Sequence, residues 1–245
     1  EAKGCFLKCL AHDPEDYASL YNVVYCYEFL DDPEGAIRFL NTYLDRNPYC
    51  QVAWHQLGKQ YYTLEMYPEA LSSFDFAIIA DESFIGAYFE KGKVLEMMGR
   101  YKEAIANYNI TIELDDPTSH AYLHIGRCFE RLGQDQQARH YYYLTVHEDP
   151  LLDKGWLAIT DFYLRQRQYR KALEYIDKAI NIDGENAQYW KRCGLIHQAL
   201  CELDEADYAY KRAVELGHAE LDIWMRWASV LRDSGEYGAA AEVLL

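Results

Sequence analysis

The sequence has no long apolar run, no pair of cysteines at metal-binding spacing and none of the familiar catalytic patterns. Without about 18 consecutive apolar residues, it predicts no membrane-spanning helix. Its seven cysteines are odd in number and form no C-x2-C pair, so a disulfide framework is not indicated. No G-x-S-x-G, H-E-x-x-H or phosphate-cradling loop occurs. We therefore predict no catalytic residue, no metal and no cofactor, and expect a protein that is not an enzyme.

Basic residues are also scarce. The chain has 24 Lys and Arg against 40 Asp and Glu, a net charge of −16, which argues against a nucleic-acid partner. Much of the acid falls in predicted turns, where carboxylates cap and complement the next helix. Six aspartates of this kind are Asp13, Asp81, Asp115, Asp116, Asp149 and Asp183. The free thiols fit a reducing compartment, so we expect a cytoplasmic protein. We also expect its partner to be a protein or peptide.

What the sequence does have is a strict internal period. Eight alanines stand 34 residues apart: Ala2, Ala36, Ala70, Ala104, Ala138, Ala172, Ala206 and Ala240. A fixed period of this length is typical of a solenoid, in which helix pairs stack because one pair cannot bury its apolar face alone. We predict that each alanine marks a close approach between helices, where a larger side chain would overpack the contact.

Other positions keep the same phase. A large side chain precedes each alanine by 16 residues, at Leu20, Trp54, Tyr88, Tyr122, Trp156, Trp190 and Trp224. Four residues further on, Gly58, Gly92, Gly126 and Gly194 mark a second close approach. Aromatic or bulky apolar residues follow the alanines by four, and Pro14, Pro48, Pro117 and Pro150 are placed to end the second helix. Together these residues resemble the tetratricopeptide repeat (TPR) family over the whole chain.

The resemblance implies an all-α fold: a right-handed superhelical TPR solenoid of stacked antiparallel helix pairs. We expect a single array over 1–245, with a half repeat at 1–16 and a partial repeat at 221–245. The full repeats are 17–50, 51–84, 85–118, 119–152, 153–186 and 187–220. First helices should cover about positions 2–14 of each repeat and second helices about 18–30. Since the chain begins and stops within a repeat and shows no atypical capping repeat, we expect a fragment of a longer array.

In this family the first helices line a concave groove that holds a partner's peptide. The groove positions here carry ten basic and only seven acidic residues, although the chain as a whole is strongly acidic. Lys59, Lys93 and Arg127 share position 9 of successive repeats, and Arg131 and Arg165 continue the row. We predict that this row binds an acidic peptide segment. An equally weighted alternative is that the cations neutralise the neighbouring Glu90, Glu96, Glu130 and Asp161.

Aromatic residues precede the cations along the predicted groove. Tyr21, Tyr25, Tyr62 and Phe89 are predicted to anchor a peptide, although in so tyrosine-rich a chain they could merely fill space. His120 and His124, four residues apart, are interpreted as surface residues. Cys193, His197 and Cys201 share a helix face, and we interpret them as packing residues because no fourth metal ligand is evident.

The predicted function is a non-catalytic protein-interaction scaffold. One alternative is a regulatory or targeting arm of a larger enzyme, whose catalytic domain would lie outside this sequence. Another is a structural array that self-assembles into homo-oligomers. The family hosts many unrelated roles, so the fold alone gives only the class of activity.

Overall fold

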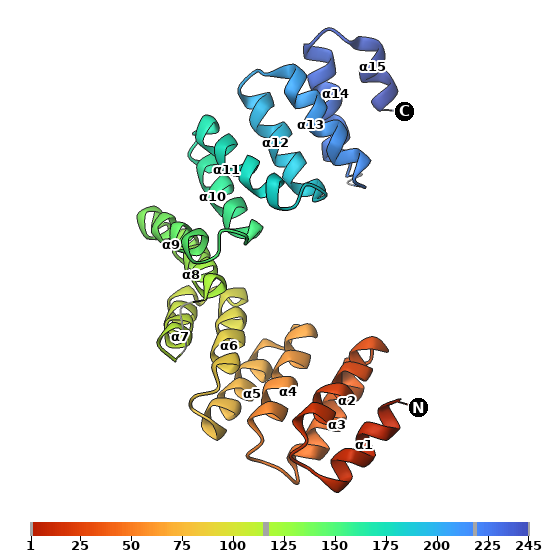
Figure 1. Ribbon diagram of the computed structural model, residues 1–245, viewed down its shortest axis with the longest axis vertical. Helices are drawn as coiled ribbons and strands as arrows, with labels where there is room; N and C mark the ends of the chain where they lie inside the picture. The colour runs from red at the N-terminus through yellow and green to blue at the C-terminus, as the bar shows by residue number, and fades with distance from the viewer. Residues whose placement is uncertain (1, 115–117, 218–219, 245) are drawn as a thin grey trace. The chain divides into compact units, whose positions relative to one another are not determined.

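The computed structural model describes residues 2–114, 118–217 and 220–244, and all regular structure in these ranges is α-helical (Figure 1). Each helix from α2 to α15 begins one residue before the predicted start. The helices are α1 (Ala2–His12), α2 (Tyr17–Phe29), α3 (Pro33–Leu44), α4 (Gln51–Thr63), α5 (Tyr67–Ala80), α6 (Ile85–Met97), α7 (Tyr101–Leu114), α8 (Ser119–Arg131), α9 (Asp135–Glu148), α10 (Asp153–Arg165), α11 (Tyr169–Ile182), α12 (Ala187–Ala199), α13 (Leu203–Glu215), α14 (Leu221–Asp233) and α15 (Tyr237–Val243). None of them has the length and hydropathy needed to cross a bilayer.

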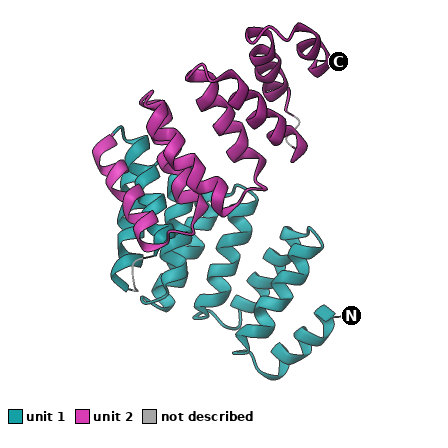
Figure 2. Cartoon of the chain, turned by 45° about the horizontal axis from the view of Figure 1, so that its top comes forward, with its two compact units in different colours: residues 1–133 teal, residues 134–245 magenta. Residues whose placement is uncertain are grey.

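The chain forms two compact units (Figure 2). Unit 1 spans residues 1–133 and contains α1 to α8, and unit 2 spans 134–245 and contains α9 to α15. In unit 1 each helix packs on the next, and the first helices α2, α4, α6 and α8 also contact each other in order. In unit 2 the pairs α10–α11, α12–α13 and α14–α15 pack in the same way. That all repeats belong to one array stays a prediction.

The alanines and glycines lie where helices approach closely. Seven of the eight periodic alanines are buried, six of them completely, whereas Ala2 near the start of α1 is exposed. A Cβ on Gly58 would stand 2.6 Å from the ring of Phe74, and a Cβ on Gly194 would stand 2.8 Å from the ring of Tyr210. Since real Cβ atoms do not approach this closely, glycine allows the ring of the second helix to rest on the first helix.

The turn between the two helices of a repeat has one fixed conformation. Position 15 of the repeat lies in this turn and has positive φ in every repeat, as predicted for Gly99, Gly133 and Gly235. Four residues that are not glycine adopt it as well: Asp31, Glu65, Arg167 and Cys201, with φ between 52° and 60°. The sequence does not reveal these four, because the helix pairing on either side imposes the conformation in spite of its cost.

The turn between repeats is closed by polar side chains. Trp54, Trp156 and Trp190 each donate an indole N–H to the carbonyl six residues earlier, at 2.8 Å. Asp13, Asp81, Asp149 and Asp183 accept the N–H two residues ahead, within the turn itself. The prediction that these carboxylates cap the next helix was therefore wrong in detail, because an Asx turn takes up the carboxylate first. Asp115, Asp116 and Pro117 lie outside the described residues.

The remaining prolines and the cysteines can be placed directly. Pro14, Pro48 and Pro150 lie two to four residues beyond the ends of second helices, as predicted. All seven cysteines are free, and Cys50, Cys128 and Cys193 are buried. Cys9, which its repeat position assigns to the core, is exposed on α1.

Candidate functional site

The candidate site in unit 1 lies on its four successive first helices, and we call it the first-helix face. It consists of Tyr21 and Tyr25 on α2, Lys59 and Tyr62 on α4, Phe89 and Lys93 on α6, and Arg127 and Arg131 on α8. Because these helices contact each other in order, equivalent repeat positions form rows that cross from helix to helix. Arg165, the last residue of the predicted cationic row, lies on α10 in unit 2.

Lys59 and Lys93 both lie near His55. Lys93 binds Glu90 at 2.8 Å and lies 5.5 Å from the ring centre of Tyr62, whereas Lys59 makes no ion pair with any described residue. His55 is mostly buried against Phe74 and Phe84, and its Nε2 atom has no hydrogen-bond partner in the described chain. Burial lowers the pKa of His55 to about 4, the nearby Glu90 opposes that shift, and the two lysines add to it.

The arginines of α8 extend the row. Arg127 is half-buried and Arg131 is exposed, and neither forms an ion pair within the described ranges. The alternative explanation, in which neighbouring acids neutralise the cations, accounts for Lys93, which binds Glu90. Glu96 is bound by Tyr108 and His124 and not by a cation of the row.

The aromatic residues of the face differ in exposure. The side chains of Tyr21 and Tyr25 are exposed, with 43% and 63% of the residue surface accessible. Tyr62 is half-buried beside Tyr67, their ring centres 6.1 Å apart. Phe89 packs edge-on against His124 at 5.4 Å and against Tyr108 at 5.5 Å. Phe89 therefore contributes to the packing between repeats, while Tyr21 and Tyr25 present open rings.

Glu96 is the centre of a polar cluster that sequence reasoning missed. One oxygen of its carboxylate, Oε2, accepts the hydroxyl of Tyr108 at 3.0 Å and lies 2.8 Å from His124 Nδ1. The interpretation of His124 as a plain surface residue was wrong, because only 18% of its side chain is exposed. Burial, with a smaller effect of Glu96, raises the pKa of the adjacent Cys128 to about 12. The separation of 28 residues between His124 and Glu96 was the available signal: it places position 6 of one repeat beside position 12 of the repeat before.

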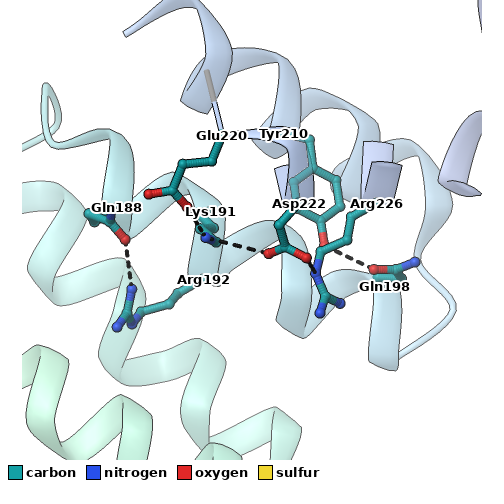
Figure 3. A network of polar contacts seen from close by, with 8 residues as sticks. All are labelled: Gln188, Lys191, Arg192, Gln198, Tyr210, Glu220, Asp222 and Arg226. Atoms are coloured by element: carbon teal, nitrogen blue, oxygen red, sulfur yellow. Dashed lines mark hydrogen bonds and ion pairs between the residues drawn. The ribbon is translucent and has the colours of Figure 1, made fainter. Parts of the chain in front are cut away.

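Unit 2 carries a different arrangement on its first helices (Figure 3). Arg192 binds Asp161 with both ends of its guanidinium, Nε to Oδ1 at 2.8 Å and Nη2 to Oδ2 at 3.3 Å. Lys191 lies between Glu220 at 2.9 Å and Asp222 at 3.5 Å, and Asp222 also binds Arg226 at 3.0 Å. Here Lys191, Arg192 and Arg226 are neutralised by acids of the same chain, and Asp161 is bound by Arg192, which is not a member of the cationic row.

The cysteines and histidine of α12 and its following turn do not come together as ligands. Cys193 is buried, and burial raises the pKa of its thiol to about 12. His197 Nδ1 lies 2.8 Å from Glu202 Oε2, and Cys201 is exposed in the turn. In the described part of the chain, no three His, Cys, Asp or Glu side chains are grouped so as to hold a metal.

The fold and this face define an α-helical repeat protein of the class that serves as a protein-interaction scaffold. Family models of the tetratricopeptide repeat match residues 89–151 and 154–186. The chain belongs to the TPR family. No curated protein matches the sequence.

Solved structures share the fold at low sequence identity. The Cut9–Hcn1 hetero-tetramer of the APC/C is 18% identical with a TM-score of 0.71, and the match covers 99% of this chain but 48% of that one. PilF of Pseudomonas aeruginosa is 18% identical with a TM-score of 0.72, covering 90% and 98% of the two chains. YrrB, described as a TPR protein with an unusual peptide-binding site, is 15% identical with a TM-score of 0.55, covering 80% and 97%. At these identities the likeness concerns the fold.

Proposed function

We propose that this chain is a non-catalytic scaffold that binds an acidic peptide segment of a partner protein on the first-helix face. The observation that carries the proposal is a contrast between the two units. On the first helices of unit 2, Lys191, Arg192 and Arg226 bind acids of the same chain. On those of unit 1, Lys59 and Arg127 have no such partner among the described residues.

Charge and aromatic surface complement each other on this face. Half-buried cations attract an anionic segment more strongly than fully solvated ones, because the surrounding protein screens charge less than water does. Tyr21 and Tyr25 offer ring surface to apolar residues of the same peptide. Arg165 would extend the cationic row if the repeats form one array. The peptide-binding site for which YrrB is described gives a precedent within the fold.

The free thiols support a cytoplasmic location. All seven cysteines are free, three of them exposed, and such thiols persist in reducing surroundings. We therefore place the scaffold in the cytoplasm, where its partner would be another protein. Localisation of the tagged full-length protein in cells tests this part.

The test of the proposed function compares two triple charge reversals. The variant Lys59→Glu, Lys93→Glu and Arg127→Glu reverses the charge of three members of the row. The control variant Arg38→Glu, Arg46→Glu and Lys102→Glu changes the net charge equally elsewhere in unit 1. We expect the first to lose binding of a fluorescein-labelled Glu-rich peptide by at least about tenfold, and the second to bind as the wild type does. Raising the salt from about 0.05 to 0.5 M should weaken wild-type binding, since exposed charge pairs are screened. Equal binding by both variants, with helical content preserved, contradicts the proposal.

A further inference from the structure

A pocket of about 400 Å³ opens between the second helices α3 and α5, over α4. Trp54 and Tyr61 of α4 form its aromatic walls, and Asn41, Ser73 and Phe76 contribute from the two second helices. It is distinct from the first-helix face, since none of the residues of that face lines it.

The same place in unit 2 is filled by the chain's own tyrosines. Equivalent residues of the two units lie three 34-residue repeats apart in the sequence. Trp54 therefore corresponds to Trp156, Tyr61 to Tyr163 and Ser73 to Tyr175. The ring of Tyr175 is stacked on Tyr163, with centres 5.5 Å apart and planes at 5°. It is also stacked on Trp156, at 6.1 Å and 14°. Tyr175 thus occupies a slot between the tryptophan and the tyrosine of the first helix.

The hydroxyl groups of the filled slot are satisfied within the slot. Tyr143, which corresponds to Asn41, has its hydroxyl 2.7 Å from that of Tyr175 and 3.0 Å from that of Tyr163. Lys178 covers the Trp156 ring, with its Nζ 4.4 Å from the ring centre. Trp156, Tyr163, Tyr143 and Lys178 thus all contact the phenol of Tyr175.

Unit 1 keeps the two walls of this slot and has Ser73 in place of Tyr175. Trp54 and Tyr61 are present, and the ring of Phe76 is stacked on one part of Trp54, with ring centres 4.7 Å apart and planes at 28°. Ser73 has no ring to insert between them, and its hydroxyl already donates to the Glu69 carbonyl at 2.8 Å. The Tyr61 hydroxyl and the Asn41 amide have no hydrogen-bond partner among the described residues, so both are available at the rim.

We propose that this pocket receives a tyrosine side chain of a partner protein, inserted between Trp54 and Tyr61. The ring would take the position that Tyr175 holds three repeats later. Its hydroxyl would bind Tyr61 and Asn41, as the hydroxyl of Tyr175 binds Tyr143. Stacked and offset aromatic pairs add to the gain from burial alone, which favours an aromatic over an aliphatic side chain of the same size.

The first experiment uses the full chain labelled with 5-fluorotryptophan and the peptide Ac-Gly-Tyr-Gly-NH2 as the probe. The protein has five tryptophans, and the Trp54→Phe variant assigns the Trp54 resonance. We expect the Trp54 fluorine signal to shift and saturate with a Kd on the order of 1 mM, as suits a single side chain. The Trp156 signal should stay in place because its slot is filled. A leucine peptide should bind at least about fivefold more weakly.

Three results of the peptide titrations would overturn the proposal: no shift at Trp54, an equal response at Trp156, or equal binding of the leucine peptide. A shift at Trp54 on raising the protein concentration without peptide would also overturn it, since the occupant would then be a second copy of this chain.

Two reciprocal variants exchange the slots. Ser73→Tyr should fill the pocket and abolish the response of Trp54, while Ser73→Ala, the matched control, should retain it. Tyr175→Ser should open the slot in unit 2, so that Trp156 begins to respond to the tyrosine peptide. Circular dichroism and thermal unfolding confirm that each variant is folded. If Ser73→Tyr does not fold, the wild-type titration and the Tyr175→Ser variant test the proposal. A Trp156 signal that does not shift with the tyrosine peptide in folded Tyr175→Ser contradicts it.

Discussion

Gly92 of α6 lies directly against the ring of Tyr108 on α7, so closely that a Cβ on Gly92 would stand 2.6 Å from the Cε1 atom of the ring. Tyr108 is completely buried there, with its hydroxyl on Glu96. The same contact joins Gly58 to Phe74 and Gly194 to Tyr210, which makes it a repeated element of the helix pair.

Gly92→Ala should therefore destabilise the protein, even though alanine favours a helix more than glycine does. Overpacking costs about 1–3 kcal/mol, against a gain in helix propensity of at most about 1 kcal/mol. Thermal and urea unfolding measure the difference. The control is Gly4→Ala in α1, where nothing lies within 4 Å of the new Cβ, and it should raise stability by a few tenths to about 1 kcal/mol. Stabilisation by both substitutions would show that the ring of Tyr108 can move away.

The left-handed turn position predicts a stabilising substitution. Arg167 has φ of 55° and an exposed side chain, so Arg167→Gly should relieve backbone strain and raise stability by about 0.5–1 kcal/mol. The reverse change, Gly99→Ala at the equivalent position with φ of 74°, should lower it by a similar amount. Thermal unfolding compares the two variants. A lower Tm for Arg167→Gly would mean that the backbone of Arg167 is not strained in solution.

His55 predicts a loss of stability on acidification. Its pKa is about 4 in the folded chain against 6.5 for the ordinary group, so between these values only the unfolded chain binds the proton. The stabilising contribution is complete above pH 6.5 and is lost as the pH falls to 4, up to roughly 3 kcal/mol. Urea unfolding at several pH values measures the slope.

His55→Gln should remove this part of the pH dependence, while His120→Gln, at an exposed position, should keep it. NMR titration of His55 gives the folded pKa directly. A midpoint near 6.5 would mean that water reaches the ring.

The pair Arg192–Asp161 predicts a measurable coupling energy. Both side chains are about 70% buried and the contact uses two nitrogen atoms of the guanidinium, so a double-mutant cycle should give about 1 kcal/mol. The control cycle uses Arg226 and Asp222, a more exposed pair one helical turn apart, which should give a few tenths of a kcal/mol. If both cycles give zero, neutralisation of the face in unit 2 does not depend on these pairs.

The repeat itself could be predicted, and the reason is physical. Alanine, glycine and large side chains recur at fixed spacing because helix packing tolerates only certain sizes at each position. Ala36 and Ala70 are buried as predicted, Gly99 has the expected positive φ, and helix starts agree within one residue. The interaction-scaffold class followed from the same pattern.

Individual contacts could not be predicted in this way. Arg167 adopts a left-handed backbone that nothing in its chemistry favours, and Cys9 is exposed despite its core position. Lys93 binds Glu90, yet Lys59 at the same repeat position has no ion pair with a described residue. Packing between helices decides the first two outcomes. The third is local, because Glu90 precedes Lys93 by three residues on the same helix, whereas Gln56 stands at that position before Lys59.

The sequence by itself determined the 34-residue period, the helix boundaries and the rows of side chains shared by equivalent positions, because local spacing along a helix sets the face on which a side chain lies. Only the tertiary structure decided that the Glu96 carboxylate binds both Tyr108 and His124. It also decided that Tyr175 fills a slot in unit 2, whereas Ser73 lines a pocket at the equivalent place in unit 1. Such contacts join residues of different helices, whose distances depend on how the helices pack.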